Sequence, residues 1–350
     1  MAGIISFLVI VVAVYLIAVV TEDFFIVSLD KVATRLEMPS DVAGASLMAV
    51  GSSAPELAIA LFAVILGGSH GDVGIGTIVG SAVFNILVIT GASAIVAGEL
   101  VINNRSVERD VAFYLLSVVL LLFVFFDGNI LLWEIILLLG AYVVYLLVLW
   151  RWGNSQPKEA EVEHTPPEER DTGQANLLQR VHHLVARLFA VIARNPAEQY
   201  VWALIISIVA IALLGYVLVE AVVILANAIG LPPVIVSLTL LAAGTSAPDL
   251  IASVNVAREG RGSMAIANAV GSNIFDILVG LGLPWLIMLF FINPTIEVTT
   301  EGLVTSIMIL GGTVFILYGF LYAGRSFTRR EGLILLGIYV LYVIYEILTH

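Results

Sequence analysis

The chain carries one seven-residue pattern twice, as GSSAPEL at residues 51–57 and as GTSAPDL at residues 244–250. Each copy places a serine, a proline and an acid, Glu56 or Asp249, inside a long apolar run. A proline has no backbone N–H, so the carbonyl about four residues earlier, near the glycine of each pattern, loses its helical partner. Each copy therefore predicts an interrupted helix with a carboxylate and free carbonyl oxygens at the break.

A second block follows each copy, as GSAVFNIL at 80–87 and as GSNIFDIL at 271–278. The two blocks recur in the same order and at similar spacing, which is the signature of an internal duplication. We expect a first transmembrane repeat at 1–150 and a second at 200–350, joined by a linker at 151–199. Five spans in each repeat would insert the second repeat upside down, as in the inverted repeats of secondary transporters.

Composition places the chain in a lipid bilayer. Its 350 residues are 60% hydrophobic and 12% charged, and the mean hydropathy is +1.07. Apolar runs of roughly 17 to 25 residues recur and lack the alternation of barrel strands. The predicted fold is therefore an all-α polytopic membrane protein of about ten helices. The predicted spans are 4–33, 40–67, 73–98, 110–126, 130–150, 200–229, 233–257, 263–291, 302–322 and 332–348.

Basic residues indicate the orientation of the chain. All 15 lysines and arginines fall in the linker, in alternate loops between the predicted spans or, for Lys31, in the last turn of the first span on the same side. By the positive-inside rule this face is cytoplasmic. We expect a multi-pass protein of the cell membrane with a cytoplasmic linker and both termini outside.

The linker divides into two parts. Residues 154–172 are rich in proline, glutamate and glutamine, a composition typical of disorder. Apolar residues then recur at helical spacing from Leu177 to Ile192 with arginines beside them, which predicts an amphipathic helix on the cytoplasmic lipid surface. Such a helix is either a regulatory element or a plain tether.

A third acid, Asp276, lies in the second block, so the repeats bring three carboxylates toward the membrane midplane. Uncharged oxygen donors accompany them: Ser52, Ser53, Ser81, Asn85, Thr245, Ser246, Ser272 and Asn273. Oxygen ligands suit hard ions such as Na⁺ and Ca²⁺. One such motif could be a mere kink, but two matched copies favour a cation site. Glu22 and Asp23 in the first span could line an ion pathway or lie at its cytoplasmic end.

At these blocks the sequence resembles the cation/calcium exchanger superfamily, and most closely its potassium-dependent sodium/calcium exchangers. EDFF at 22–25, DVAGA at 41–45 and GTIVGSAVFN at 76–85 extend the resemblance, and the short linker suggests a compact prokaryotic type. The resemblance implies Glu56 and Asp249 as central calcium ligands. It implies that the other calcium and sodium positions are completed by Ser52, Ser53, Ser81, Asn85, Thr245, Ser246, Ser272 and Asp276.

The function implied is an antiporter that exchanges Na⁺ for Ca²⁺ by alternating access, with the first and sixth helices sliding across the others. In the family an acid at the position of Asp276 is associated with potassium coupling, although some potassium-independent prokaryotic relatives also have it. The ions are transported, so we expect no catalytic residue, no cofactor, no nucleic acid and no protein partner.

The main alternative is a Ca²⁺/H⁺ antiporter on the same scaffold, because carboxylates also exchange protons. An intramembrane aspartyl hydrolase using Asp249 and Asp276 would need a Gly-x-Gly-Asp motif, which the sequence lacks, and a cation channel would differ in flux rate.

Overall fold

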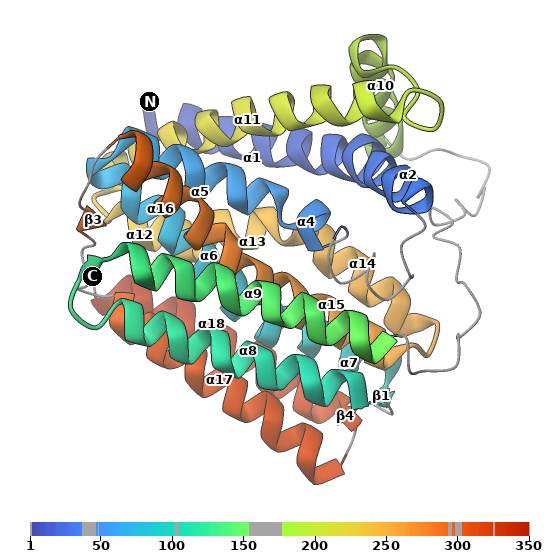
Figure 1. The fold of residues 1–350 in the computed structure, drawn as a ribbon, viewed down its shortest axis with the longest axis vertical. Coiled ribbons are helices and arrows are strands. Elements are labelled where there is room, and N and C mark those ends of the chain that lie inside the picture. Colours follow the sequence, from blue (N-terminus) through green and yellow to red (C-terminus); the bar gives the residue numbers. More distant parts are fainter. Residues whose placement is uncertain are drawn as a thin grey trace.

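The computed structural model describes residues 2–36, 47, 49–101, 105–153, 177–292, 296–297, 303–324 and 326–349, which are almost entirely helical (Figure 1). The DVAGA segment at 41–45 and the linker segment at 154–172 lie outside the described residues, so the expectations for them stay predictions.

The first half contains five helical spans. The first is α1 (Ala2–Val20), the π-helical η1 (Thr21–Ile26) and α2 (Val27–Arg35), and the second is α4 (Ala49–Ser52) and α5 (Ala54–Leu66). After the short η3 (Gly68–His70), the third is α6 (Gly71–Phe84), the π-helical η4 (Asn85–Ile89) and α7 (Thr90–Ala97). The fourth and fifth are α8 (Arg105–Val124) and α9 (Leu132–Gly153).

The second half repeats this arrangement after the linker helix α10 (Leu177–Ala193). The sixth span is α11 (Tyr200–Ile229), and the seventh is α12 (Pro233–Val236), the π-helical η5 (Ser237–Leu241), α13 (Ala242–Thr245) and α14 (Ala247–Arg258). The eighth is α15 (Gly262–Phe275), the π-helical η6 (Asp276–Leu281) and α16 (Gly282–Phe291). The ninth and tenth are α17 (Leu303–Gly324) and α18 (Arg329–Thr349).

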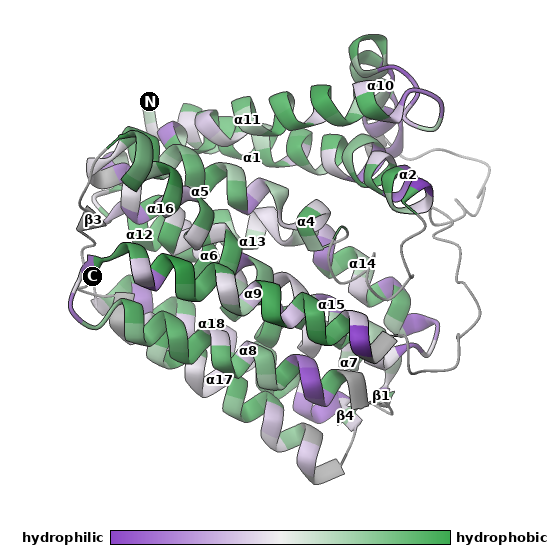
Figure 2. Cartoon of the chain, viewed as in Figure 1, coloured by the Kyte–Doolittle hydropathy of each residue, from purple (hydrophilic) through white to green (hydrophobic). Residues whose placement is uncertain are grey.

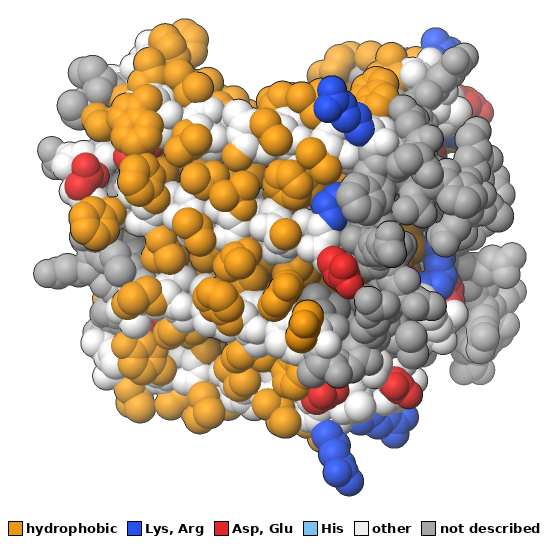
Figure 3. All heavy atoms as spheres, turned by 60° about the horizontal axis from the view of Figure 1, so that its bottom comes forward, with side chains coloured by type: hydrophobic (Ala, Val, Ile, Leu, Met, Phe, Trp, Pro, Cys, Tyr) orange, Lys and Arg blue, Asp and Glu red, His pale blue; other side chains and the backbone are white. Residues whose placement is uncertain are grey.

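The predicted fold class is confirmed. Within the described residues, six helices are long and apolar enough to cross a membrane, and the pair that bends by 46° before Ala247 makes a seventh. Each of the predicted spans coincides with a helix or a run of helices, and their ends differ by a few residues where both ends are described. Hydrophobic residues predominate along the helices (Figure 2), and in the space-filling view apolar side chains cover much of the visible face while Lys and Arg lie toward one end (Figure 3).

The two halves are related as an inverted repeat, and two short strand pairs display that relation. β1 (Glu99–Val101), after the third span, pairs with β4 (Ser326–Thr328), before the tenth. β3 (Ile296–Glu297), after the eighth span, pairs with β2 (Asn129–Ile130), before the fifth. A two-fold rotation that exchanges the repeats therefore exchanges the two pairs, which lie at opposite ends of the helices (Figure 1).

Backbone contact between α6 and the seventh span holds the halves together at the centre. A Cβ on Gly76 would lie 3.0 Å from the Val234 carbonyl oxygen, and one on Gly80 would overlap the Leu238 backbone. These glycines let the third and seventh spans approach more closely than any other residue would allow. Ser81 follows directly, so this contact also positions the site described below.

We expect Gly80→Ala to destabilise the protein by roughly 1–3 kcal/mol, because the added methyl group must displace the Leu238 backbone. The matched control is Gly312→Ala in α17, where an added Cβ meets nothing within 4 Å. That change should be neutral or slightly stabilising, since alanine favours a helix. Thermal unfolding in detergent measures both variants, and equal midpoints would show that the close approach is unimportant.

Candidate cation site

The two repeated motifs interrupt their helices at equivalent serines. Ser53 lies between α4 and α5 with φ −92° and ψ 7°, and Ser246 lies between α13 and α14 with φ −84° and ψ 1°. Pro55 and Pro248 follow in the first turn of the next helix, where a missing N–H costs no hydrogen bond within that helix. The carbonyls of Gly51 and Gly244 consequently lose their usual donors.

Three carboxylates are buried around these breaks. Glu56 and Asp249 lie in the first turns of α5 and α14 with exposed fractions of 3% and 8%, and Asp276 begins η6 with 1%. The three carboxylates are close enough to interact electrostatically: the negative charge of Asp249 repels that of Glu56, and both repel the charge of Asp276. The N-terminal ends of α5 and α14 favour negative charge at Glu56 and Asp249. The structure thus brings together the three acids that the sequence singled out.

Serine hydroxyl groups join the two repeats directly. Ser81 Oγ lies 2.8 Å from Ser246 Oγ, and Ser52 Oγ lies 3.2 Å from Ser272 Oγ. Ser272 Oγ also donates to Asp249 Oδ2 at 3.3 Å.

Each motif also places a hydroxyl beside the acid of the other. The hydroxyl of Ser52 interacts with the carboxylate of Asp249, and the hydroxyl of Thr245 interacts with the carboxylate of Glu56. Ser52 and Thr245 hold equivalent positions in the two repeats, and each lies beside the carboxylate of the other repeat.

Two amide side chains meet at the same level. Asn85 Nδ2 donates to Asn273 Oδ1 at 2.9 Å, and Asn273 Nδ2 donates to the Ala82 carbonyl at 3.1 Å. This arrangement occupies the side chain of Asn273, whereas the Oδ1 atom of Asn85 is left without a donor among the described residues.

Four buried side-chain oxygens of the site have no hydrogen-bond partner in the described part of the chain: Ser53 Oγ, Glu56 Oε2, Asn85 Oδ1 and Asp276 Oδ1. Leaving such atoms unpaired is costly, and buried polar atoms are normally satisfied. Cations are partners that satisfy oxygens of this kind. Across the described ranges, no three His, Cys, Asp or Glu side chains form a metal cluster by themselves. The further ligands would therefore be hydroxyl, amide and carbonyl oxygens.

Two π-helical segments begin at equivalent positions of the site. η4 starts at Asn85 and η6 starts at Asp276, each directly after the phenylalanine of the second block. A π-helical turn holds one extra residue and recurs at functional sites. Nothing in the apolar pattern of these spans predicted this change of helix type.

Two further residues of the site also escaped prediction. Tyr114 in α8 is fully buried, and its hydroxyl lies near the Asn273 side chain and within reach of the charge of Asp276. Asn268 acts on Asp249 and donates to Ser253 Oγ at 3.1 Å. A single tyrosine or asparagine in an apolar run gives no signal, because only the packing of spans reveals its neighbours.

Among the other acids in the spans, Glu22 lies close enough to the second motif to feel the charge of Asp249, whereas Asp23 and Glu220 have histidine partners. Asp23 Oδ2 lies 2.9 Å from His182 Nε2 of α10, and Glu220 Oε2 lies 3.7 Å from His70 Nε2. Asp23 therefore contacts the linker helix.

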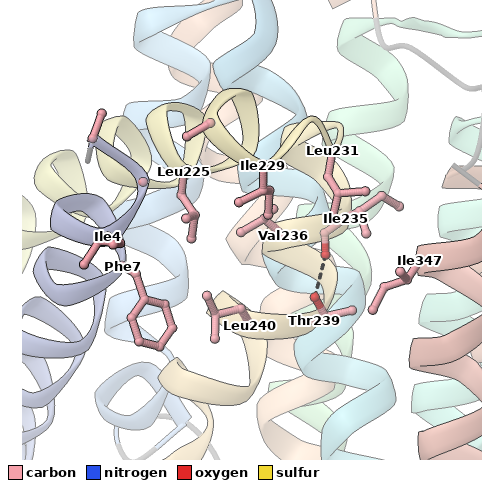
Figure 4. A pocket seen from close by; sticks show the side chains of 13 residues that line it. Ile4, Phe7, Leu225, Ile229, Leu231, Ile235, Val236, Thr239, Leu240 and Ile347 are labelled. Carbon is pink, nitrogen blue, oxygen red and sulfur yellow. Dashed lines mark hydrogen bonds between the residues drawn. The ribbon is translucent and has the colours of Figure 1, made fainter.

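An apolar groove is likewise separate from the carboxylates. It measures about 700 Å³, and α1, α11, the start of the seventh span and Ile347 line it with apolar side chains (Figure 4). Its one hydroxyl, that of Thr239, donates to the Ile235 carbonyl at 2.7 Å. No lining residue could bind a cation through a carboxylate.

Comparison with solved structures shows the fold. The sodium-calcium exchanger NCX_Mj is 23% identical with a TM-score of 0.59, covering 98% of this chain and 99% of its own. The H⁺/Ca²⁺ exchanger CAX is 14% identical with a TM-score of 0.70, covering 98% of this chain and 81% of its own.

Comparison with sequences shows the family. Human sodium/potassium/calcium exchanger 5 is 31% identical over 98% of this chain and 84% of its own length. Human sodium/potassium/calcium exchanger 4 is 28% identical over 95% and 79%. The model of the sodium/calcium exchanger protein family matches residues 5–151 and 199–348, on both sides of the linker. The resemblance seen in the repeated blocks is thereby confirmed, and the chain belongs to the sodium/calcium exchanger family of the cation/calcium exchanger superfamily.

Proposed function

We propose that the protein exchanges Na⁺ for Ca²⁺, with K⁺ as a co-transported ion, by alternating access at one site between the repeats. The observation that carries this proposal is the pair of buried acids, Glu56 and Asp249, at equivalent helix breaks among unpartnered oxygens. Family membership supports transport of these ions, and the human relatives quoted above are named as sodium/potassium/calcium exchangers.

The charge of the site provides a physical reason for strict exchange. Two or three carboxylates in a poorly hydrated space are strongly destabilised unless cations neutralise them. After Ca²⁺ leaves, the site must therefore bind other cations before the protein can change the side of the membrane to which the site is open. Several Na⁺ ions meet that need, so the release of one ion species requires the binding of the other.

We assign the ligands by charge and position. Glu56 and Asp249 are the central calcium ligands, and Asp276 adds the third charge. Hydroxyl and amide oxygens complete the calcium and sodium positions: Ser52, Ser53, Ser81, Asn85, Thr245, Ser246 and Ser272. Their polarity, without imidazole or thiolate, matches hard cations.

We also infer that the end of the bundle that carries the arginines faces the cytoplasm and that both termini lie outside a cell membrane. N and C mark one end of the bundle, whereas α2, the end of α14 and the strand pair β1–β4 lie at the other (Figure 1). Lys31, Arg35 and Arg258 belong to that second end, as the positive-inside rule requires of a cytoplasmic face.

The identity of the driving ion separates this proposal from its rival. A Ca²⁺/H⁺ antiporter remains the second candidate, because the fold also matches the H⁺/Ca²⁺ exchanger CAX. In proteoliposomes loaded with Na⁺, we expect radioactive Ca²⁺ uptake when external Na⁺ is removed at equal pH. Uptake that needs a pH gradient and ignores Na⁺ would identify the proton antiporter instead.

Removing either central charge should abolish calcium transport. In Glu56→Gln or Asp249→Asn, the positive charge of Ca²⁺ is no longer fully balanced. The loss of one buried carboxylate lowers the affinity for Ca²⁺ by roughly a hundredfold or more. The matched control is Asp30→Asn, which removes an exposed carboxylate of α2. Sodium-driven uptake should persist in the control, and normal coupled uptake in both site variants would refute the central assignment.

Asp276 should determine the potassium requirement. If K⁺ compensates the third carboxylate, the Asp276→Asn variant needs one positive charge fewer. We therefore expect its sodium-driven calcium uptake to depend less on K⁺, with a smaller change in the half-saturating calcium concentration. Uptake is measured with K⁺ or with an impermeant organic cation on the calcium side. An unmutated protein that ignores K⁺ would exclude co-transport while leaving sodium/calcium exchange intact.

A further inference from the structure

The linker helix α10 exposes one apolar face. Val181, Leu184, Leu188, Val191 and Ile192 recur at helical spacing on one side of the helix, with exposed fractions from 40% at Val181 to 77% at Val191. Clustered apolar side chains of this kind mark a contact surface for a membrane or another protein.

Contacts on another face of α10 fix its orientation. The ring of Phe189 packs edge-to-face on Phe24 of η1 with centroids 4.8 Å apart, and His182 Nε2 lies 2.9 Å from Asp23 Oδ2. Trp202 of α11 donates its indole N–H to the Ile192 carbonyl at 2.9 Å. The helix is therefore docked on the first and sixth spans, and its apolar face is turned away from that contact.

Two exposed arginines lie beside the apolar face. Arg180 and Arg187 are seven residues apart, or about two helical turns, so both project from the same side of α10. The helix from Leu177 to Ala193 contains no acidic residue to neutralise them. Guanidinium groups bind phosphate through paired hydrogen bonds, which makes an anionic, phosphate-bearing partner complementary to this side.

The chain itself places α10 beside a bilayer. Only residues 194–199 separate it from α11, a helix long and apolar enough to cross the membrane. An apolar face bordered by arginines on a helix held at that level has the composition of an interfacial helix. A soluble protein partner would leave the proximity to lipid unexplained.

We propose that α10 is a binding surface for anionic phospholipids, with its apolar face at the acyl boundary and Arg180 and Arg187 on the headgroup phosphates. Since α10 is docked on η1 through Phe189 and His182, a bound lipid also braces the first span. Binding of lipid does not depend on which ions the protein exchanges.

A fluorescent probe on the apolar face tests this surface in the full chain. The sequence has no cysteine, so Leu188→Cys provides a single labelling position. The labelled protein is placed, one copy per nanodisc, in phosphatidylcholine with increasing fractions of phosphatidylglycerol. We expect the emission to shift to the blue, and nitroxide-bearing lipids to quench it, as the fraction of phosphatidylglycerol rises.

Two pairs of arginine variants provide the decisive comparison. Arg180→Gln with Arg187→Gln should weaken the apparent affinity for phosphatidylglycerol by roughly fivefold for each arginine. The control pair, Arg258→Gln with Arg330→Gln, removes the same charge from two exposed positions toward the same end of the bundle. It should leave the apparent affinity for phosphatidylglycerol unchanged. Raising the salt concentration should weaken binding in the parent, because it screens charges on the surface.

Three outcomes would overturn the proposal. The first is a probe emission that does not change with the fraction of phosphatidylglycerol. The second is an equal loss of apparent affinity for phosphatidylglycerol in the two variant pairs. The third is burial of the probe only when two copies share a nanodisc, which would mean that a second copy of the chain covers α10. Size-exclusion profiles that match the parent establish that the variants are folded.

Discussion

Buried negative charge is the constraint on which this structure depends. A carboxylate inside a bilayer is stable only with a partner or in a polar cavity, and here Glu56, Asp249 and Asp276 repel one another inside the same bundle. The protein reduces this cost with helix N-termini and with hydroxyls from the opposite repeat, but several oxygens still lack a donor among the described residues. Under the proposed function, the transported cations would stabilise a site left incomplete in this way.

The inverted repeat explains why one site arises from two motifs. Each half supplies a broken helix, an acid and a set of hydroxyls, and the candidate site contains groups from both halves. Contacts such as Ser81 with Ser246, and the close approach of α6 to the seventh span, set the spacing between the two contributions. Because each acid has a hydroxyl of the other repeat beside it, a relative movement of the halves would alter both sides of the site together.

Much of this arrangement was predictable from the sequence because it follows from periodicity and repetition. The sixth span was predicted at 200–229 and is found at those residues, since an apolar run bounded by a glycine defines a membrane helix directly. The proximity of the acids and hydroxyls at the two helix breaks was predictable because the duplication marks equivalent positions, while their role as ligands stays a prediction. The π-helical turns at Asn85 and Asp276, the neighbourhood of Tyr114 and the contact between His182 and Asp23 were not predicted. These depend on how separate spans pack, which no local pattern encodes.

The exchange of strand partners between repeats has a consequence for the origin of such a molecule. β1 of the first half pairs with β4 of the second, and β3 of the second pairs with β2 of the first. Two identical five-helix chains, inserted in opposite directions, would form the same two sheets, one on each side of the bilayer. A dual-topology homodimer is thus geometrically sufficient to build this architecture, and gene fusion then needs to add only a linker such as the one that contains α10.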